Sequence, residues 1–179
     1  MPKYLAFLRA INVGGHTVKM DYLRTLFEEV GFANVETFIA SGNIVFDSKS
    51  KNTKTLEQKI EEHLREILGY EVRTFVRATS ELTELANYKP FVAAEVNAAG
   101  HRLYVGFLAD KPSNEAKQKV SSLSGATDDF AVHGREVFWL CRTKLSESAV
   151  SGALLEKTLG MPATFRNVNT VRRLAAKYS

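Results

Sequence analysis

The sequence contains little that would cross-link, anchor or export the protein. Cys141 is the single cysteine among 179 residues, so no disulfide forms within the chain, and we expect a reducing, cytoplasmic setting. The longest apolar runs have the length of a strand and fall far short of the roughly 20 residues that cross a bilayer, so we expect no membrane segment. The opening residues, "MPKYLAFLRAINV", carry an arginine within their short apolar run and no small-residue cleavage site, so we expect no secretory signal.

The sequence also lacks the motifs of several enzyme classes. Its four histidines have no metal-ligand spacing with one another or with Cys141. Ser41 precedes a glycine but lacks the G-x-S-x-G pattern of hydrolases. The "NVGG" stretch at 12–15 is followed by no Gly-Lys-Ser/Thr and does not have the spacing of a dinucleotide fingerprint. We therefore predict no catalytic residue, no metal ligand and no cofactor.

The charge balance is mildly basic. Lysine and arginine total 24 against 20 acidic residues, which gives a net charge of +4 and a pI near 9.2. The charges are dispersed, and the densest basic cluster is "RRLAAKY" at 172–178. This excess permits binding to phosphates or nucleic acid, but many ordinary globular proteins carry as much. Charge alone therefore does not decide the kind of partner.

The spacing of apolar residues predicts six elements in the first half of the chain and a short helix that closes it. Strands are expected at 4–11, 35–40, 44–48 and 71–78. Helical spacing from Met20 to Val30 and from Leu56 to Ile67 predicts two helices, each ended by a glycine, and residues 79–88 predict a short closing helix. The order strand, helix, strand, strand, helix, strand is typical of a ferredoxin-like unit.

The second half repeats this order. Strands are expected at 102–109, in a hairpin at 129–141 and at 162–167, with helices between them and a closing helix capped by Asn169. Segments echo one another too: "YLAFLRA" resembles "YVGFLAD", and "TFIASGNIVF" resembles "DFAVHGREVF" with a common offset that matches Phe46 to Phe138. We predict an α+β protein of two tandem ferredoxin-like halves related by internal duplication, residues 1–90 and 100–179, joined by a linker at 91–99.

Three short polar segments supply the candidate ligand-binding residues. Each of these residues is polar or a glycine and lies in a predicted loop or at a predicted helix start. They are Arg9, Asn12, Gly14, Gly15, Ser41, Gly42, Asn43, Arg166, Asn167, Asn169 and Thr170. In a ferredoxin-like unit the first two segments emerge at the same edge of the sheet, and the third joins them only if the halves are arranged head to tail. Glycine N–H groups, helix N-termini and arginines at such a junction favour a small phosphate-bearing or other anionic ligand.

Other interpretations of these segments remain open. Glycines after a strand commonly serve a turn, Ser-Gly-Asn is an ordinary hairpin sequence, and Asn169 fits a plain helix cap. A nucleic-acid-binding protein that uses its basic surface is an alternative, as is an enzyme acting on the anionic ligand. Such an enzyme would need an acid or base near the segments, where His16, Lys19 and the arginines are available. The sequence does not set the oligomeric state.

The same three segments resemble those of a known family, the bacterial proteins of unknown function grouped as DUF1697. The family pattern is R-G-I-N-V-G-G near the start, S-G-N-V-V-F after the first helix and T-R-N-x-N-T near the end. The corresponding segments here are "RAINVGG" at 9–15, "SGNIVF" at 41–46 and "TFRNVNT" at 164–170, so that Ala10 replaces a glycine and Phe165 is additional. The resemblance implies a tandem α-β plait and no established activity, substrate or cofactor.

Overall fold

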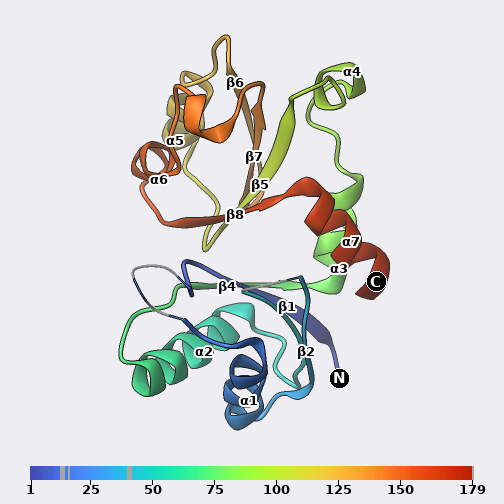
Figure 1. The fold of residues 1–179 in the computed structure, drawn as a ribbon, viewed down its shortest axis with the longest axis vertical. Coiled ribbons are helices and arrows are strands. Elements are labelled where there is room, and N and C mark those ends of the chain that lie inside the picture. The colour runs from blue at the N-terminus through green and yellow to red at the C-terminus, as the bar shows by residue number, and fades with distance from the viewer. Residues whose placement is uncertain (13–14, 16, 40–41, 179) are drawn as a thin grey trace. The chain divides into compact units, whose positions relative to one another are not determined.

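The structure, a computed structural model, describes residues 1–12, 15, 17–39 and 42–178. They form two compact units: unit 1 comprises Met1–Thr83 with Leu174–Ser179, and unit 2 comprises Glu84–Arg173. Each unit contains one four-stranded antiparallel sheet covered on one face by helices (Figure 1). The limits of the sequence repeat, 1–90 and 100–179, remain a prediction, because the units are defined by packing rather than by similarity.

Unit 1 has the predicted ferredoxin-like topology, with sheet order β2-β3-β1-β4. Its elements are β1 (Lys3–Leu8), α1 (Met20–Val30), β2 (Ala33–Thr37), β3 (Asn43–Asp47), α2 (Thr53–Leu68), β4 (Thr74–Ala78) and the start of α3 (Thr79–Asn87). β1 ends at Leu8, three residues before the predicted end, because Ala10 adopts a left-handed conformation (φ +56°) that extended chain does not have.

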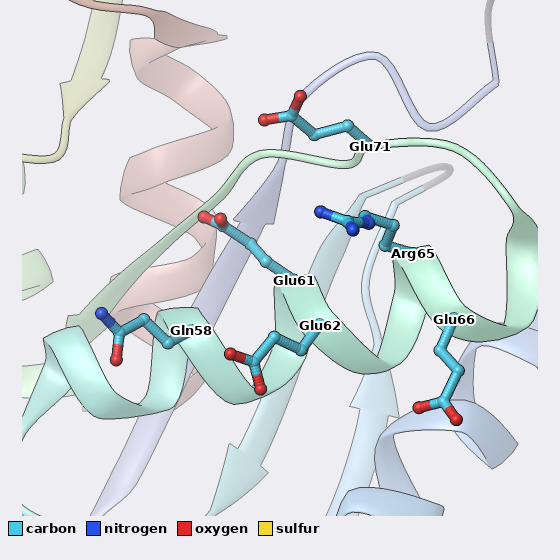
Figure 2. Close-up of a pocket in the computed structure, with 6 residues that line it drawn as sticks. All are labelled: Gln58, Glu61, Glu62, Arg65, Glu66 and Glu71. Atoms are coloured by element: carbon cyan, nitrogen blue, oxygen red, sulfur yellow. The ribbon is translucent and has the colours of Figure 1, made fainter.

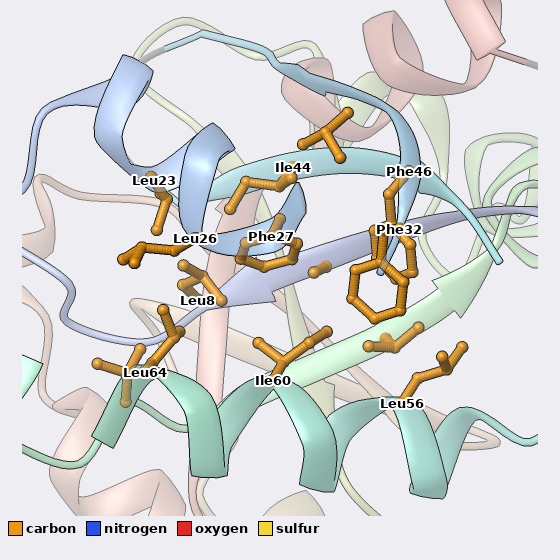
Figure 3. Packing of buried hydrophobic residues seen from close by; sticks show 14 of the residues in the cluster. Leu8, Leu23, Leu26, Phe27, Phe32, Ile44, Phe46, Leu56, Ile60 and Leu64 are labelled. Atoms are coloured by element: carbon orange, nitrogen blue, oxygen red, sulfur yellow. The ribbon is translucent and has the colours of Figure 1, made fainter. Parts of the chain in front are cut away.

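The core of unit 1 lies between the sheet and helices α1 and α2 (Figure 3). Its members are buried side chains at helical spacing on α1 (Leu23, Leu26, Phe27), at helical spacing on α2 (Leu56, Ile60, Leu64), and on the helix-facing side of the strands (Tyr4, Ala6, Leu8, Ile44, Phe46). The Phe32 and Phe46 rings stack at 4.2 Å between centroids. Both helices end at a glycine with positive φ, as predicted: Gly31 at +108° and Gly69 at +82°.

Unit 2 repeats this topology, with sheet order β6-β7-β5-β8. Its elements are the end of α3, α4 (Ala93–Val96), β5 (Arg102–Leu108), α5 (Asn114–Ser121), β6 (Asp128–His133), β7 (Glu136–Cys141), a 3-10 turn at Leu145–Glu147, α6 (Gly152–Leu159), β8 (Ala163–Asn167) and the start of α7 (Val168–Tyr178). Ser113 caps α5 by accepting the Ala116 N–H.

Strand register corrects how the halves correspond. Tyr4 pairs with Phe46 in sheet β2-β3-β1-β4, and Tyr104 pairs with Trp139 in sheet β6-β7-β5-β8. Phe46 therefore corresponds to Trp139, and the predicted match of Phe46 to Phe138 is one residue out of register. A one-residue slip moves a strand side chain to the other face, and Phe46 and Trp139 indeed both face the helices of their unit.

The same correction applies to the last strand of each unit. Leu5 pairs with Arg77 on β4, and Val105 pairs with Arg166 on β8. The two arginines thus occupy equivalent positions. The sequences around them, "VRTFVRATSELTELA" at 72–86 and "PATFRNVNTVRRLAA" at 162–176, resemble one another most closely when Arg77 is aligned with Asn167, one residue away from this register.

Two glutamates on α2 complete the hydrogen bonding of the edge strand β4. The outer N–H groups of an edge strand have no neighbouring strand to bind. Here Glu57 Oε2 accepts the Val76 N–H at 2.8 Å, and Glu61 Oε1 accepts the Thr74 N–H at 3.2 Å. Residues four apart on a helix lie on one face, so a pair of glutamates one turn apart binds alternate residues of the strand.

Unit 2 keeps one of these two contacts. Glu156 Oε1 on α6 accepts the Ala163 N–H of the edge strand β8 at 3.1 Å. Gly152, four residues before Glu156, stands where α2 has its second glutamate, and a Cβ added to it would lie 3.7 Å from the Phe165 ring. Gly106 on β5 also faces this ring: its Cβ would approach Phe165 Cε1 to 2.7 Å, so only glycine fits there. The additional Phe165 thus requires glycine at 106, whereas a side chain at 152 would make only an ordinary contact with it.

The C-terminal turn of α7 belongs to unit 1. The Tyr178 hydroxyl donates to Glu36 Oε2 at 2.8 Å, and the Tyr178 ring meets Phe38 edge-on. Burial and the contact with Glu36 raise the pKa of Tyr178 to about 12. The end of the chain is therefore fixed on the β2 side of the sheet by a polar and an aromatic contact.

No helix in the described part of the chain has both the length and the apolar character needed to cross a membrane.

Candidate functional site

In unit 1 the end of β1, next to the first polar segment, is hydrogen-bonded to the hairpin that carries the second. The Leu8 N–H donates to the Gly42 carbonyl at 2.8 Å, which joins the end of β1 to the β2–β3 hairpin. The Arg9 N–H donates to the carbonyl of Arg73, before β4, at 2.9 Å. Gly14 and Ser41, two of the predicted ligand residues, lie outside the described residues, as does His16.

The carboxamides of Asn12 and Asn43 bind the chain itself. Asn12 Oδ1 accepts the Val18 N–H at 2.7 Å and so closes the loop that leads into α1. Asn43 Nδ2 donates to the Phe38 and Ile39 carbonyls at 3.2 and 3.3 Å, across the base of the hairpin. Both asparagines therefore hold loop geometry, which is the structural alternative that the sequence left open.

Left-handed backbone conformations concentrate in these two loops. Ala10, Gly15, Ile39 and Gly42 have φ of +56°, +84°, +48° and +98°. Gly42 explains the glycine of the "SGN" motif, since the tight hairpin requires a conformation that side chains disfavour. Ala10 stands where the DUF1697 pattern has glycine, and its positive φ gives the physical reason for that glycine.

The third polar segment forms the junction of β8 and α7 in unit 2. We predicted that Asn169 caps the helix, but α7 already begins at Val168. Asn167 Oδ1 accepts the Asn169 N–H at 2.9 Å, so Asn167 is the capping residue and Asn169 lies in the first turn with Thr170. The cap prediction was wrong by two residues because several polar residues in a row fit the same signal.

Arg166 is bound by its own strand. Its Nη1 donates to Thr164 Oγ1 at 2.8 Å and to the Phe165 carbonyl at 3.0 Å. Burial lowers the pKa of Arg166 to about 10, so the guanidinium remains charged at pH 7. Its counterpart Arg77 likewise donates to the Val76 carbonyl at 3.0 Å. The shared geometry indicates that both arginines stabilise their strands.

A polar pocket of about 250 Å³ lies beside the start of α7, within unit 2. It is lined by Val96, Asn97, His101, Arg102, Leu103, Asn167, Val168, Asn169 and Arg172. Two arginines and one histidine face this space, and no carboxylate is among the described residues that line it. Arg166 and Thr170 are not part of the lining, whereas Asn167 and Asn169 are.

Hydrogen bonds fix the histidine of this pocket. His101 Nδ1 lies 2.6 Å from the Glu95 carbonyl, which can only accept, so Nδ1 carries a proton; the same nitrogen lies 3.8 Å from Glu95 Oε2. The Glu95 carboxylate is held by Arg142 Nε at 3.1 Å, and Arg142 also binds Asp129. Glu95 is therefore neutralised by a partner other than the pocket arginines.

A second cavity of about 350 Å³ adjoins this pocket. It is lined mostly by apolar and aromatic side chains, together with a few polar ones: Ala86, Tyr88, Lys89, Pro90, Phe91, Ala93, Val96, Asn97, Leu103 and Arg172. The two cavities share Val96, Asn97, Leu103 and Arg172. Arg172 thus borders both cavities.

Unit 1 has a hollow of different chemistry, shown in Figure 2. Its volume is about 670 Å³, and its lining consists of Gln58, Glu61, Glu62, Arg65, Glu66 and Glu71. Glu62 is exposed, whereas Glu61 is half-buried and bound to β4, and burial raises the pKa of Glu61. No group of three or more acidic, histidine or cysteine side chains among the described residues is placed to hold a metal ion.

The buried carboxylate of Asp128, in unit 2, accepts hydrogen bonds from three side chains. Asp128 accepts from Trp139 Nε1 at 2.8 Å, from Ser148 Oγ at 2.7 Å and from Thr127 Oγ1 at 2.6 Å. Burial alone would raise the pKa of Asp128, but these donors and the Cys141 thiol outweigh it and lower the pKa. Asp128 therefore joins β6 to β7 and to the loop before α6.

Sequence reasoning found the two asparagines of the polar pocket and missed its cations. Arg172 was noted only as part of the basic cluster at 172–178. His101 and Arg102 stand at the start of β5, where the sequence offers only an apolar strand pattern. One feature of the sequence could have indicated the pocket cations: residues 166–173 contain three arginines and no acidic residue.

Two units with equivalent strand orders, β2-β3-β1-β4 and β6-β7-β5-β8, define the class of this protein as tandem ferredoxin-like α+β. A family model described as "Protein of unknown function (DUF1697)" matches residues 1–138, and the chain belongs to that family. The match includes the first two motifs and ends before the third, at 164–170, so it covers less of the chain than the predicted resemblance.

Among solved structures, the conserved bacterial protein SP0830 from Streptococcus pneumoniae is similar, with a TM-score of 0.77 and 23% sequence identity over 99% of this chain and 98% of that one. At this identity the similarity shows the fold alone. No curated protein matches the sequence.

Proposed function

We propose that unit 2 binds a small anionic ligand, most simply one that bears a phosphate, in the polar pocket beside the start of α7. The observation that carries the proposal is the composition of the lining, in which Arg102 and Arg172 meet the helix start without any carboxylate among the described residues. Neither arginine forms an ion pair with another described residue.

The start of α7 adds to the attraction. The first N–H groups of a helix have no partner within it, and the aligned peptide dipoles place roughly half a positive charge there. Asn167 satisfies the Asn169 N–H, so that the rest of the first turn remains for a ligand. Asn167 and Asn169 belong to the predicted ligand residues; for Arg166 and Thr170, the support is a position next to the pocket rather than in its lining.

The experiment is a titration with inorganic pyrophosphate followed by calorimetry, on the full chain and on three variants. Arg172→Ala and Arg102→Ala each remove one guanidinium that borders the pocket, and we expect each to weaken binding roughly tenfold or more, since a charge-assisted contact contributes ~1.4 kcal/mol or more. Lys117→Ala, on the exposed face of α5, removes a cation that is not part of the lining and is the matched control.

A loss confined to the two arginine variants supports the pocket. Equal affinity in all four proteins contradicts it. Binding of a mixed-sequence oligonucleotide that is tighter than that of pyrophosphate and falls steeply with salt would instead favour the nucleic-acid-binding alternative. A cytoplasmic setting is part of the proposal, and it is supported by the reduced, buried Cys141.

A further inference from the structure

The cavity beside the polar pocket, lined mostly by apolar and aromatic residues, has features of a site for a planar ring. Its volume of about 350 Å³ falls within the roughly 300–1,000 Å³ of small-molecule pockets. Two aromatic residues, Tyr88 and Phe91, line it together with Pro90 and Leu103. All four come from the segment that follows α3 and from the start of β5 (Figure 1).

The two aromatic rings differ in their partners. Tyr88 stacks on His133 with 4.0 Å between ring centroids, and its centroid lies 5.2 Å from that of Phe138. These two rings hold the Tyr88 ring in place. Phe91 is half-buried and forms no ring contact within the part of the chain that the structure describes. A half-buried phenyl ring on a cavity wall without a ring partner is available for stacking.

The two cavities are adjacent and share part of their walls. Val96, Asn97, Leu103 and Arg172 line both, so a single ligand can place one part in each. The anionic part would lie near the arginines, and the apolar part would lie against Phe91. Asn97, on the shared wall, offers both a donor and an acceptor to polar atoms of a ring or a sugar.

We infer that the ligand of unit 2 is a nucleotide-like anion, in which a phosphate occupies the polar pocket and a planar ring occupies the cavity lined by Phe91. This inference rests on the proposed anion binding and adds the class of the ligand to it. Base–aromatic stacking tolerates any base, because each has a π-face, so the geometry predicts a preference for the ring and not for one particular base.

The test compares three probes on the full chain: inorganic pyrophosphate, ribose 5-phosphate and adenosine 5′-monophosphate. We expect adenosine 5′-monophosphate to bind roughly tenfold more tightly than ribose 5-phosphate, in line with the strength of one stacked base. Phe91→Ala and Phe91→Leu should both bring this ratio close to one, while the affinity for ribose 5-phosphate stays unchanged. Phe91→Leu keeps the apolar volume and so guards against a folding defect.

Val92→Ala is the matched control, because Val92 is the next residue, is 68% exposed and lines neither cavity. It should leave both affinities unchanged. Equal binding of ribose 5-phosphate and adenosine 5′-monophosphate would overturn the ring site while leaving the anion site intact. A ratio that survives both Phe91 variants would overturn it too. Failure of all three probes to bind would refute the anion site itself, and the ring site with it.

Discussion

The two glutamates that complete the edge strand β4 make unequal contacts, and their removal should cost unequal amounts of stability. Glu57 Oε2 accepts the Val76 N–H at 2.8 Å and lies 4.0 Å from Arg77 Nη1, in a fully buried setting. Glu61 Oε1 accepts the Thr74 N–H at the longer distance of 3.2 Å and is half-buried.

The contacts set the expected magnitudes. A hydrogen bond to a charged group contributes about 1.5–3 kcal/mol, and removing one partner of a buried ion pair costs about 3–5 kcal/mol. Because the Arg77 contact is at the limit of an ion pair, we expect Glu57→Ala to lower the free energy of unfolding by about 3 kcal/mol. Glu57→Gln keeps an acceptor for Val76 and should cost about 1–2 kcal/mol; Glu61→Ala should cost about 0.5–1 kcal/mol.

Urea unfolding at pH 7, followed by far-ultraviolet circular dichroism, measures these differences. Trp139, the single tryptophan, lies in unit 2, so its fluorescence does not report directly on the mutated strand. With a slope of about 2 kcal/mol per molar urea, Glu57→Ala should shift the midpoint by about 1.5 M. A shift below about 0.3 M, or one no larger than that of Glu61→Ala, would refute the assigned role of Glu57.

Three further predictions concern single side chains. Asp128→Asn should lower the free energy of unfolding by about 2–3 kcal/mol at pH 7. Because the folded pKa of Asp128 is lowered, its contribution to stability is present above the unfolded pKa of 3.8 and is lost as pH falls. Acid unfolding, followed by Trp139 fluorescence, should therefore begin at higher pH in the variant, and an unchanged profile would contradict this. Tyr178→Phe should remove one late tyrosinate from an alkaline absorbance titration, since the folded pKa is raised to about 12 by burial and the contact with Glu36, and stability from this group is present below pH 10 and lost as pH rises through 12. Ala10→Gly should raise the stability by about 0.5–1 kcal/mol in thermal unfolding, because φ is +56° there; a decrease would refute the strain.

Local signals in the sequence predicted the order of the elements. Gly31, Gly69 and Gly160 each follow an apolar helical pattern, and all three adopt the positive φ of a helix end. The register between the two halves was harder to predict. A strand with aromatic residues on both faces resembles its counterpart almost equally well when the alignment of the two sequences is shifted by one residue. The match of Phe46 to Phe138 rather than Trp139 arose in this way.

Side chains that act across elements were the least predictable. Glu57 and Glu61 look like solvated helix charges in the sequence, and only the distance from α2 to β4 shows that they bind a strand. The polar pocket is similar in this respect. Asn167 and Asn169 belong to one polar segment of the sequence, whereas Arg102 lines the same pocket from β5, 65 residues before Asn167.

The most direct test of the anion pocket is a two-dimensional ¹H–¹⁵N NMR titration with pyrophosphate, which reports on each backbone amide separately. We expect saturable shifts of the amides at 167–170 and 101–103, and their disappearance in Arg172→Ala. Shifts that are confined to the loops at 9–12 and 42–43, or that rise linearly without saturation, would contradict the assignment of the pocket.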